Sequence, residues 1–128
     1  MENEKEISWF KFQSNYGNIR TSKVGVTISK DGTLRFNKVT GERLNLKPTQ
    51  SVLLAYVIKE NWILIKRLST PETGSRELRA LKDRSAHTLA INQFLQHSRV
   101  NWGSKTMYEV DKQISTGFIV INLNKIVG

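Results

Sequence analysis

Apolar and polar residues alternate most regularly in the first third of the chain. Over residues 24–29 every second residue is apolar, which is the period of a strand with one buried face. The alternation returns with Leu34 and Phe36, which are expected to point inward, and Arg35 between them is expected to point outward. Residues 30–32 end in Asp-Gly, a pair that suits a type I′ turn because both central residues then have positive φ. The pattern predicts a β-hairpin.

Two further hairpins are predicted later in the chain. Residues 51–58 form a continuous apolar run, and residues 62–66 form another after a short polar turn. Runs of this kind are typical of strands buried on both faces. Residues 107–110 and 118–123 are apolar segments on either side of a Ser-Thr-Gly turn, and they predict the closing hairpin.

Two segments predict helices. Asn37 is a suitable N-cap for a short helix near 38–45, and Pro48 stops the helix beyond it. Ser85 is a suitable N-cap for one longer helix near 86–97, where apolar residues recur at the spacing of a helix face.

Together these elements predict an α+β fold that is mainly antiparallel β-sheet. The length of 128 residues indicates a single domain, 1–128. Residues 1–6 are strongly charged and are expected to fray, and residues 70–84, with a proline, a glycine and scattered charges, are expected to form a mobile loop.

The composition carries no sign of a membrane or of a disulfide framework. Cysteine is absent, no signal peptide is visible at the N-terminus, and no apolar run reaches the length of a membrane span. We therefore expect a cytoplasmic protein with no membrane partner.

The net charge is the feature of the sequence that says most about function. The chain has 20 Lys and Arg against 11 Asp and Glu, a net charge of +9. Residues 20–47 contribute seven basic and two acidic residues to this surplus. A surplus of this size in a small domain favours a polyanionic partner, above all nucleic acid. A solvated lysine-rich surface is the alternative.

Candidate catalytic and metal-binding groups are few. His87 and His97 are ten residues apart on one expected helix, which places them about 15 Å apart along its axis, too far to share a metal. The glycines lack the spacing of a phosphate-binding loop, and Glu72 and Glu77 lie in a basic segment where they balance charge. We expect no enzyme activity, no cofactor, no metal and no small-molecule substrate.

The expected nucleic-acid contacts are basic residues of the first hairpin and its surroundings, together with one aromatic residue. Basic side chains neutralise phosphates, and exposed aromatic rings stack on unpaired bases. Trp102 lies in a predicted connection, where it either stacks on a base or covers the edge of the sheet. The candidate site residues are Arg20, Lys23, Lys30, Arg35, Lys38, Arg43 and Trp102.

Residues 24–67 resemble the AbrB-type swapped-hairpin DNA-binding regulators. The segments that carry the resemblance are Gly-Thr-Leu-Arg-Phe at 32–36, the hinge at 37–46 and the apolar strands at 51–58 and 62–67. The resemblance implies transcription regulation by a homodimer with interleaved hairpins, and DNA contacts from Lys30, Arg35, Lys38 and Arg43. In its order of hairpins followed by a helix, the chain is also similar to single-strand-binding proteins of the positive-cofactor and Whirly type.

The sequence thus predicts a non-enzymatic nucleic-acid-binding protein. DNA is favoured over RNA, and the contacts are expected mainly with the phosphate backbone, because no recognition helix with a clear polar face is present. The protein would act as a dimer, either as a regulator or as a single-strand binder. The alternative is an interaction module, such as a small phage or host-regulatory protein, that binds an acidic protein partner.

Overall fold

The computed structural model describes residues 23–81, 86–113 and 115–127. Four expectations fall wholly or partly elsewhere: the fraying of residues 1–6, the contact from Arg20, residues 82–84 at the end of the expected loop, and the N-cap at Ser85 lie outside the described residues. None of the described helices is long and apolar enough to cross a membrane.

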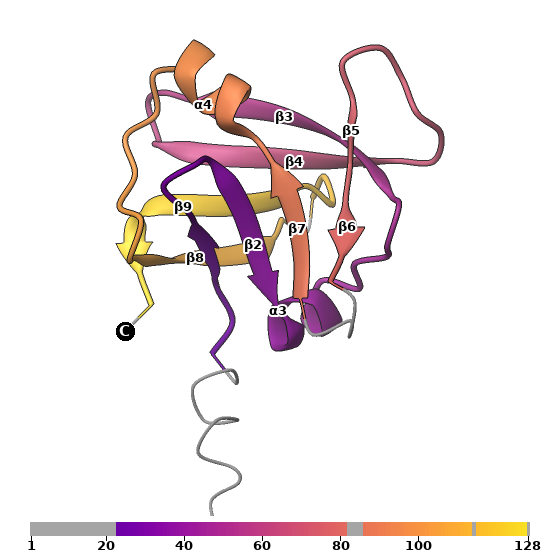
Figure 1. The fold of residues 1–128 in the computed structure, drawn as a ribbon, viewed down its shortest axis with the longest axis horizontal. Coiled ribbons are helices and arrows are strands. Elements are labelled where there is room, and N and C mark those ends of the chain that lie inside the picture. Colours follow the sequence, from indigo (N-terminus) through magenta and orange to yellow (C-terminus); the bar gives the residue numbers. More distant parts are fainter. Residues whose placement is uncertain (1–22, 82–85, 114, 128) are drawn as a thin grey trace, which may run out of the picture.

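The described residues form nine strands and two short helices (Figure 1). The strands are β1 (Val26–Ile28), β2 (Thr33–Asn37), β3 (Ser51–Val57), β4 (Trp62–Leu68), β5 (Arg76–Glu77), β6 (Arg79–Ala80), β7 (Ala86–Ala90), β8 (Met107–Lys112) and β9 (Ile119–Ile126), and the helices are α3 (Lys38–Arg43) and α4 (Asn92–His97). The expectation of an α+β fold that is mainly antiparallel sheet is confirmed at this level. The three expected hairpins occur as strand pairs, but they are parts of one larger sheet.

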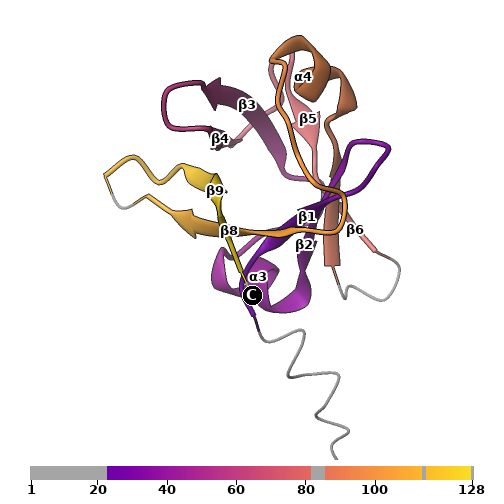
Figure 2. The same cartoon turned by 90° about the vertical axis from the view of Figure 1, so that its left-hand side faces the viewer.

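The single sheet has the order β5-β3-β4-β9-β8-β1-β2-β7-β6, and every pair in it is antiparallel. Its two outermost strands, β5 and β6, are separated in sequence only by Leu78. One short segment therefore pairs with β3 at one end and with β7 at the other, and the sheet curls into a nearly closed barrel (Figures 1 and 2). This arrangement leaves little unpaired sheet edge.

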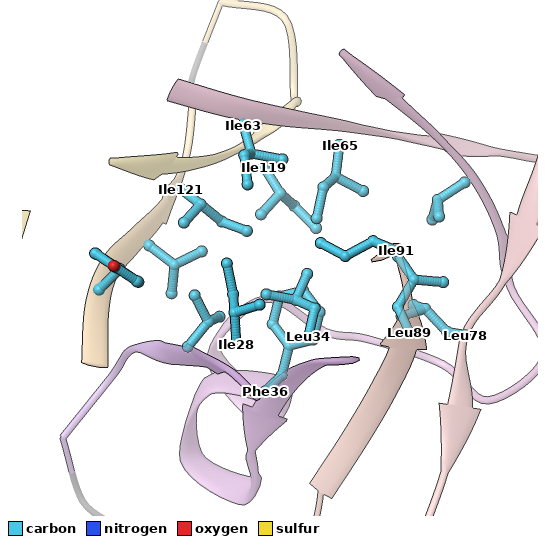
Figure 3. Close-up of a cluster of buried hydrophobic side chains, with 14 of the residues drawn as sticks. Ile28, Leu34, Phe36, Ile63, Ile65, Leu78, Leu89, Ile91, Ile119 and Ile121 are labelled. Carbon is cyan, nitrogen blue, oxygen red and sulfur yellow. The ribbon is translucent and has the colours of Figure 1, made fainter. Parts of the chain in front are cut away.

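The interior of the barrel is filled with aliphatic and aromatic side chains. The labelled residues in Figure 3 converge from opposite sides of the barrel, and each is almost completely buried. They are Ile28, Leu34, Phe36, Ile63, Ile65, Leu78, Leu89, Ile91, Ile119 and Ile121. The alternation expected at 33–36 is confirmed, because Leu34 and Phe36 are buried while Arg35 is exposed. The centre is thus a packed core.

The turn of the first hairpin differs in type from the expectation. Ser29 O accepts a hydrogen bond from Gly32 N at 3.0 Å, and Ser29 N donates to Thr33 O at 2.9 Å. Only Gly32, with φ of 83°, has positive φ within the turn. This is a type I turn followed by a glycine bulge, in which only Gly32 takes the left-handed conformation. The expected type I′ turn would have required positive φ at both of its central residues.

The short helix near 38–45 is confirmed as α3, which covers one end of the barrel. The side chain of Asn37 accepts a hydrogen bond from Thr40 N at 2.8 Å, as an N-cap should. The helix ends because Asn45 has φ of 55°, and Leu46 N then donates back to Gly41 O at 2.8 Å, which is a Schellman motif. Thr40, buried, also bonds to Gly25 through its hydroxyl.

The longer helix expected near 86–97 is wrong over its first half. Residues Ala86–Ala90 form strand β7, which pairs with β2 along its whole length, and only Asn92–His97 are helical, as α4. Leu89, which suits a helix stripe, instead lies in the barrel interior opposite Leu34. The pairing with a distant strand decided the conformation where local spacing favoured a helix.

Two further expectations change in detail. The hairpin β3–β4 is not buried on both faces, because Leu53, Val57 and Leu64 on its outer side are only half-buried and Ala55 is exposed. The barrel is a single layer there, with no described element packed outside it. The segment expected as a loop at 70–84 contains β5, β6 and the buried Leu78.

Candidate nucleic-acid interface

A row of polar side chains crosses the outer face of four neighbouring strands. In the register of the sheet Thr27 pairs with Arg35, Arg35 with Thr88, and Thr88 with Arg79. Both arginines are exposed. Two strand spacings place the Cα atoms of Arg35 and Arg79 about 10 Å apart. The sheet therefore presents two guanidinium groups side by side with threonine hydroxyls between them.

This row lies in a surface depression that extends along the barrel. One part is lined by residues including Lys30, Arg35, Thr33 and Thr88, and the adjoining part by Thr33, Thr88, Arg76 and Arg79. Because Thr33 and Thr88 line both parts, the two form one continuous groove. We call it the arginine groove and define it by its four cations, Lys30, Arg35, Arg76 and Arg79. Two acids, Asp31 and Glu77, also line it.

One acid of the groove is held by its own turn. The Asp31 carboxylate accepts hydrogen bonds from Ser29 and Thr33 side chains, and these bonds hold the pKa of Asp31 below its usual value. The Ser29 hydroxyl in turn accepts from Thr33 N at 3.1 Å. The carboxylate therefore stays ionised and orders the turn that presents Lys30.

The tip of the first hairpin is fixed against the start of α4. Ile91 N donates to Gly32 O at 2.9 Å, and a Cβ atom at Gly32 would come within 2.5 Å of the Asn92 Cβ. Only glycine fits both the positive φ and this close approach. The contact holds Lys30 and α4 in a fixed relation.

Trp102 is less exposed than the sequence suggested. Its ring is half-buried against the core, and its Nε1 donates to Ser29 O at 3.1 Å. The indole thereby contacts the base of the β1–β2 turn, and stacking on a base stays a prediction. It acts beside the groove as a support for Lys30.

Three of the expected contacts lie at the other end of β2. Lys23 and Lys38 are neighbours there, because Asn37 Nδ2 donates to Lys23 O at 2.9 Å and Lys38 begins α3. Arg43 ends α3 and lies 3.7 Å from a carboxylate oxygen of Asp111, with both side chains exposed. An exposed pair at this distance contributes little to stability. The length of β2, about 13 Å, separates this group from the turn that carries Lys30.

Sequence reasoning missed half of the groove. Arg76, Arg79 and Thr88 belong to segments that were expected to be a loop and a helix. The available signal was the alternation of Leu89 and Ile91 with polar or small neighbours, which fits strand as well as helix for so short a stretch.

The two histidines do not lie on one helix. His87 is on β7, where its ring lies against Gly41 of α3, and His97 ends α4. Burial lowers the pKa of His87, and its Nδ1 has no hydrogen-bond partner among the described residues. Within the same ranges, no cluster of three His, Cys, Asp or Glu side chains is placed to hold a metal.

Comparison of the chain with models of protein families, with curated proteins and with solved structures gives no match.

Proposed function

We propose that this protein binds nucleic acid through the arginine groove and catalyses no reaction on it. The observation that carries the proposal is the cross-strand row of Arg35, Thr88 and Arg79, extended at its ends by Lys30 and Arg76. The net charge of +9 supplies long-range attraction for a polyanion.

The chemistry of the row fits phosphate rather than base edges. A guanidinium group binds phosphate oxygens through two parallel hydrogen bonds, and a threonine hydroxyl donates one more. The row lies on a sheet, and the two described helices, α3 and α4, are only six residues long each. We therefore infer contacts mainly with the phosphate backbone of the nucleic acid, and DNA is the favoured ligand. The protein would act as a regulator or as a single-strand binder.

The experiment is a titration of fluorescently labelled DNA with the protein at several salt concentrations. Each phosphate contact adds about 0.7 (single strand) to 0.9 (duplex) to the slope of log affinity against log salt. The double variant Arg35→Gln with Arg79→Gln should reduce that slope by roughly 1.4–1.8, while Lys59→Gln, an exposed charge in the β3–β4 turn, should change affinity little.

Two results would contradict the proposal. One is an affinity that does not fall as salt rises. The other is an effect of the groove variant, which removes two charges, that is no more than twice the effect of the Lys59→Gln control, which removes one, since net charge alone would then explain the binding. In either case the alternative of an acidic protein partner becomes the next hypothesis.

The homodimer stays a prediction, and one surface suits it better than the others. Val57, Trp62, Leu64 and Val120 form an apolar, half-buried outer face on β3, β4 and β9. An exposed face of this kind favours association. The arginine groove does not suit a two-fold contact, because a second copy would bring like charges together.

A further inference from the structure

A second depression lies under α4, at the end of the arginine groove. It is a cleft of about 760 Å³ between α4 and strands β3 and β5. Arg76 and Ala90 line both this cleft and the adjoining part of the arginine groove. The cationic surface and the cleft are therefore continuous, and Arg76 stands at their junction.

The lining of the cleft differs from that of the groove. Leu53, Leu54 and Phe94 contribute apolar surface, and Phe94 adds an aromatic ring beside the imidazole of His97. The polar groups beside them include the amides of two glutamines of α4, Gln93 and Gln96. An amide offers both donors and an acceptor, and an aromatic ring offers a stacking surface. This combination fits a flat heterocycle with polar edges.

The cleft is held in place relative to the groove. Leu95, fully buried, anchors α4 in the core, and Ile91 N bonds to Gly32 O in the hairpin that carries Lys30. Arg76 Nη2 donates to Gln93 Oε1 at 3.3 Å across the mouth of the cleft. A long bond between two exposed side chains is easily exchanged for a bond to a ligand.

We propose that the α4 cleft takes an unpaired nucleobase of the strand whose phosphates lie along the arginine groove. The proposal rests on the proposed function and specifies its ligand as single-stranded. In a duplex the bases are stacked and paired, and entry into the cleft would require one of them to be flipped out at a cost in free energy. A single strand offers its bases without that cost.

The test compares three ligands of equal length with one protein. They are an oligothymidine of about twelve nucleotides, the corresponding abasic strand and the corresponding duplex. The single strand should bind on the order of 5- to 150-fold more tightly than the abasic strand, because both carry the same phosphates and only one carries bases.

Two variants separate a binding role from a structural one. Phe94→Leu keeps apolar volume but removes the ring, and it should weaken binding of oligothymidine while leaving the abasic strand unaffected. Phe118→Leu, at a half-buried phenylalanine next to β9, is the matched control and should alter neither. A fault in folding would weaken both ligands equally, which thermal unfolding of each variant would reveal.

The outcomes distinguish this proposal from the proposed function. Equal affinity for the abasic strand and oligothymidine, with the groove variant still weaker, would overturn the base-binding cleft and leave the groove in place. Tighter binding of the duplex than of the single strand would also overturn it. Failure of all three ligands to bind would remove both proposals.

Discussion

Leu78 is the residue on which closure of the barrel depends. It joins β5 to β6, it is only 1% exposed, and both its backbone N–H and its C=O form hydrogen bonds. Leu78 N donates to Gln50 O at 2.9 Å, and Leu78 O accepts from Thr49 N at 2.9 Å. Replacing it with alanine leaves these bonds and removes only side-chain atoms from the core. Leu78→Ala therefore isolates the packing contribution to closure.

The expected cost follows from the burial. Leucine-to-alanine changes in a core destabilise by about 2–5 kcal/mol, and the loss grows with the cavity that remains. Here the cavity lies between hydrogen-bonded strands that resist collapse, so we expect a value of about 3 kcal/mol or more. A domain of this size has a free energy of unfolding of about 5–15 kcal/mol, so the change is a large fraction of it. The midpoint of thermal unfolding should fall on the order of 10 °C.

Urea unfolding followed by tryptophan fluorescence measures this loss. The control is Leu53→Ala, the same change at a half-buried position on the outer side of β3, and it should cost clearly less. A loss below about 1 kcal/mol for Leu78→Ala, or a loss no greater than that of the control, would refute the reasoning, because the segment 76–80 would then not be packed into the barrel.

Other predictions follow from the same geometry. Because burial lowers the pKa of His87 below 6.5, the unfolded chain takes up the proton first as the pH falls, so stability should be constant above pH 6.5 and decrease below it; His87→Gln should flatten this part of a plot of melting temperature against pH, and an unchanged slope would contradict the assignment. Leu64→Glu, in the middle of the apolar outer face, should convert the expected dimer to a monomer in sedimentation experiments. It should leave the affinity of each chain for DNA at the wild-type level, because the arginine groove is unchanged. A wild-type protein that sediments as a monomer at high concentration would contradict the prediction of a homodimer.

The sequence predicted the parts of the fold that local chemistry determines. The β1–β2 hairpin follows from alternation and a glycine at the turn, and α3 follows from its Asn37 cap. In these elements a few neighbouring residues supply both the pattern and the hydrogen bonds. The side-chain directions of Leu34, Arg35 and Phe36 were predicted for the same reason.

The elements that the sequence did not predict are those that depend on distant partners. Strands β5 and β6 are two residues each and exist because β3 and β7 pair with them. Residues 86–90 have apolar spacing that suits a helix, but β2 supplies a full set of strand partners. Pairings between residues so far apart in sequence leave no signal in a short window.

The same division runs through the candidate site. Arg35 belongs to a local hairpin and was predicted, whereas Arg76 and Arg79 come from the segment that closes the barrel. Leu78, buried between them, holds that segment to the core, so closure of the fold and assembly of the groove depend on the same five residues. A change that loosens this segment should therefore weaken DNA binding even where it leaves every charge in place. Charge alone predicted a class of function, and the closure of the sheet is what brings Arg76 and Arg79 beside Arg35.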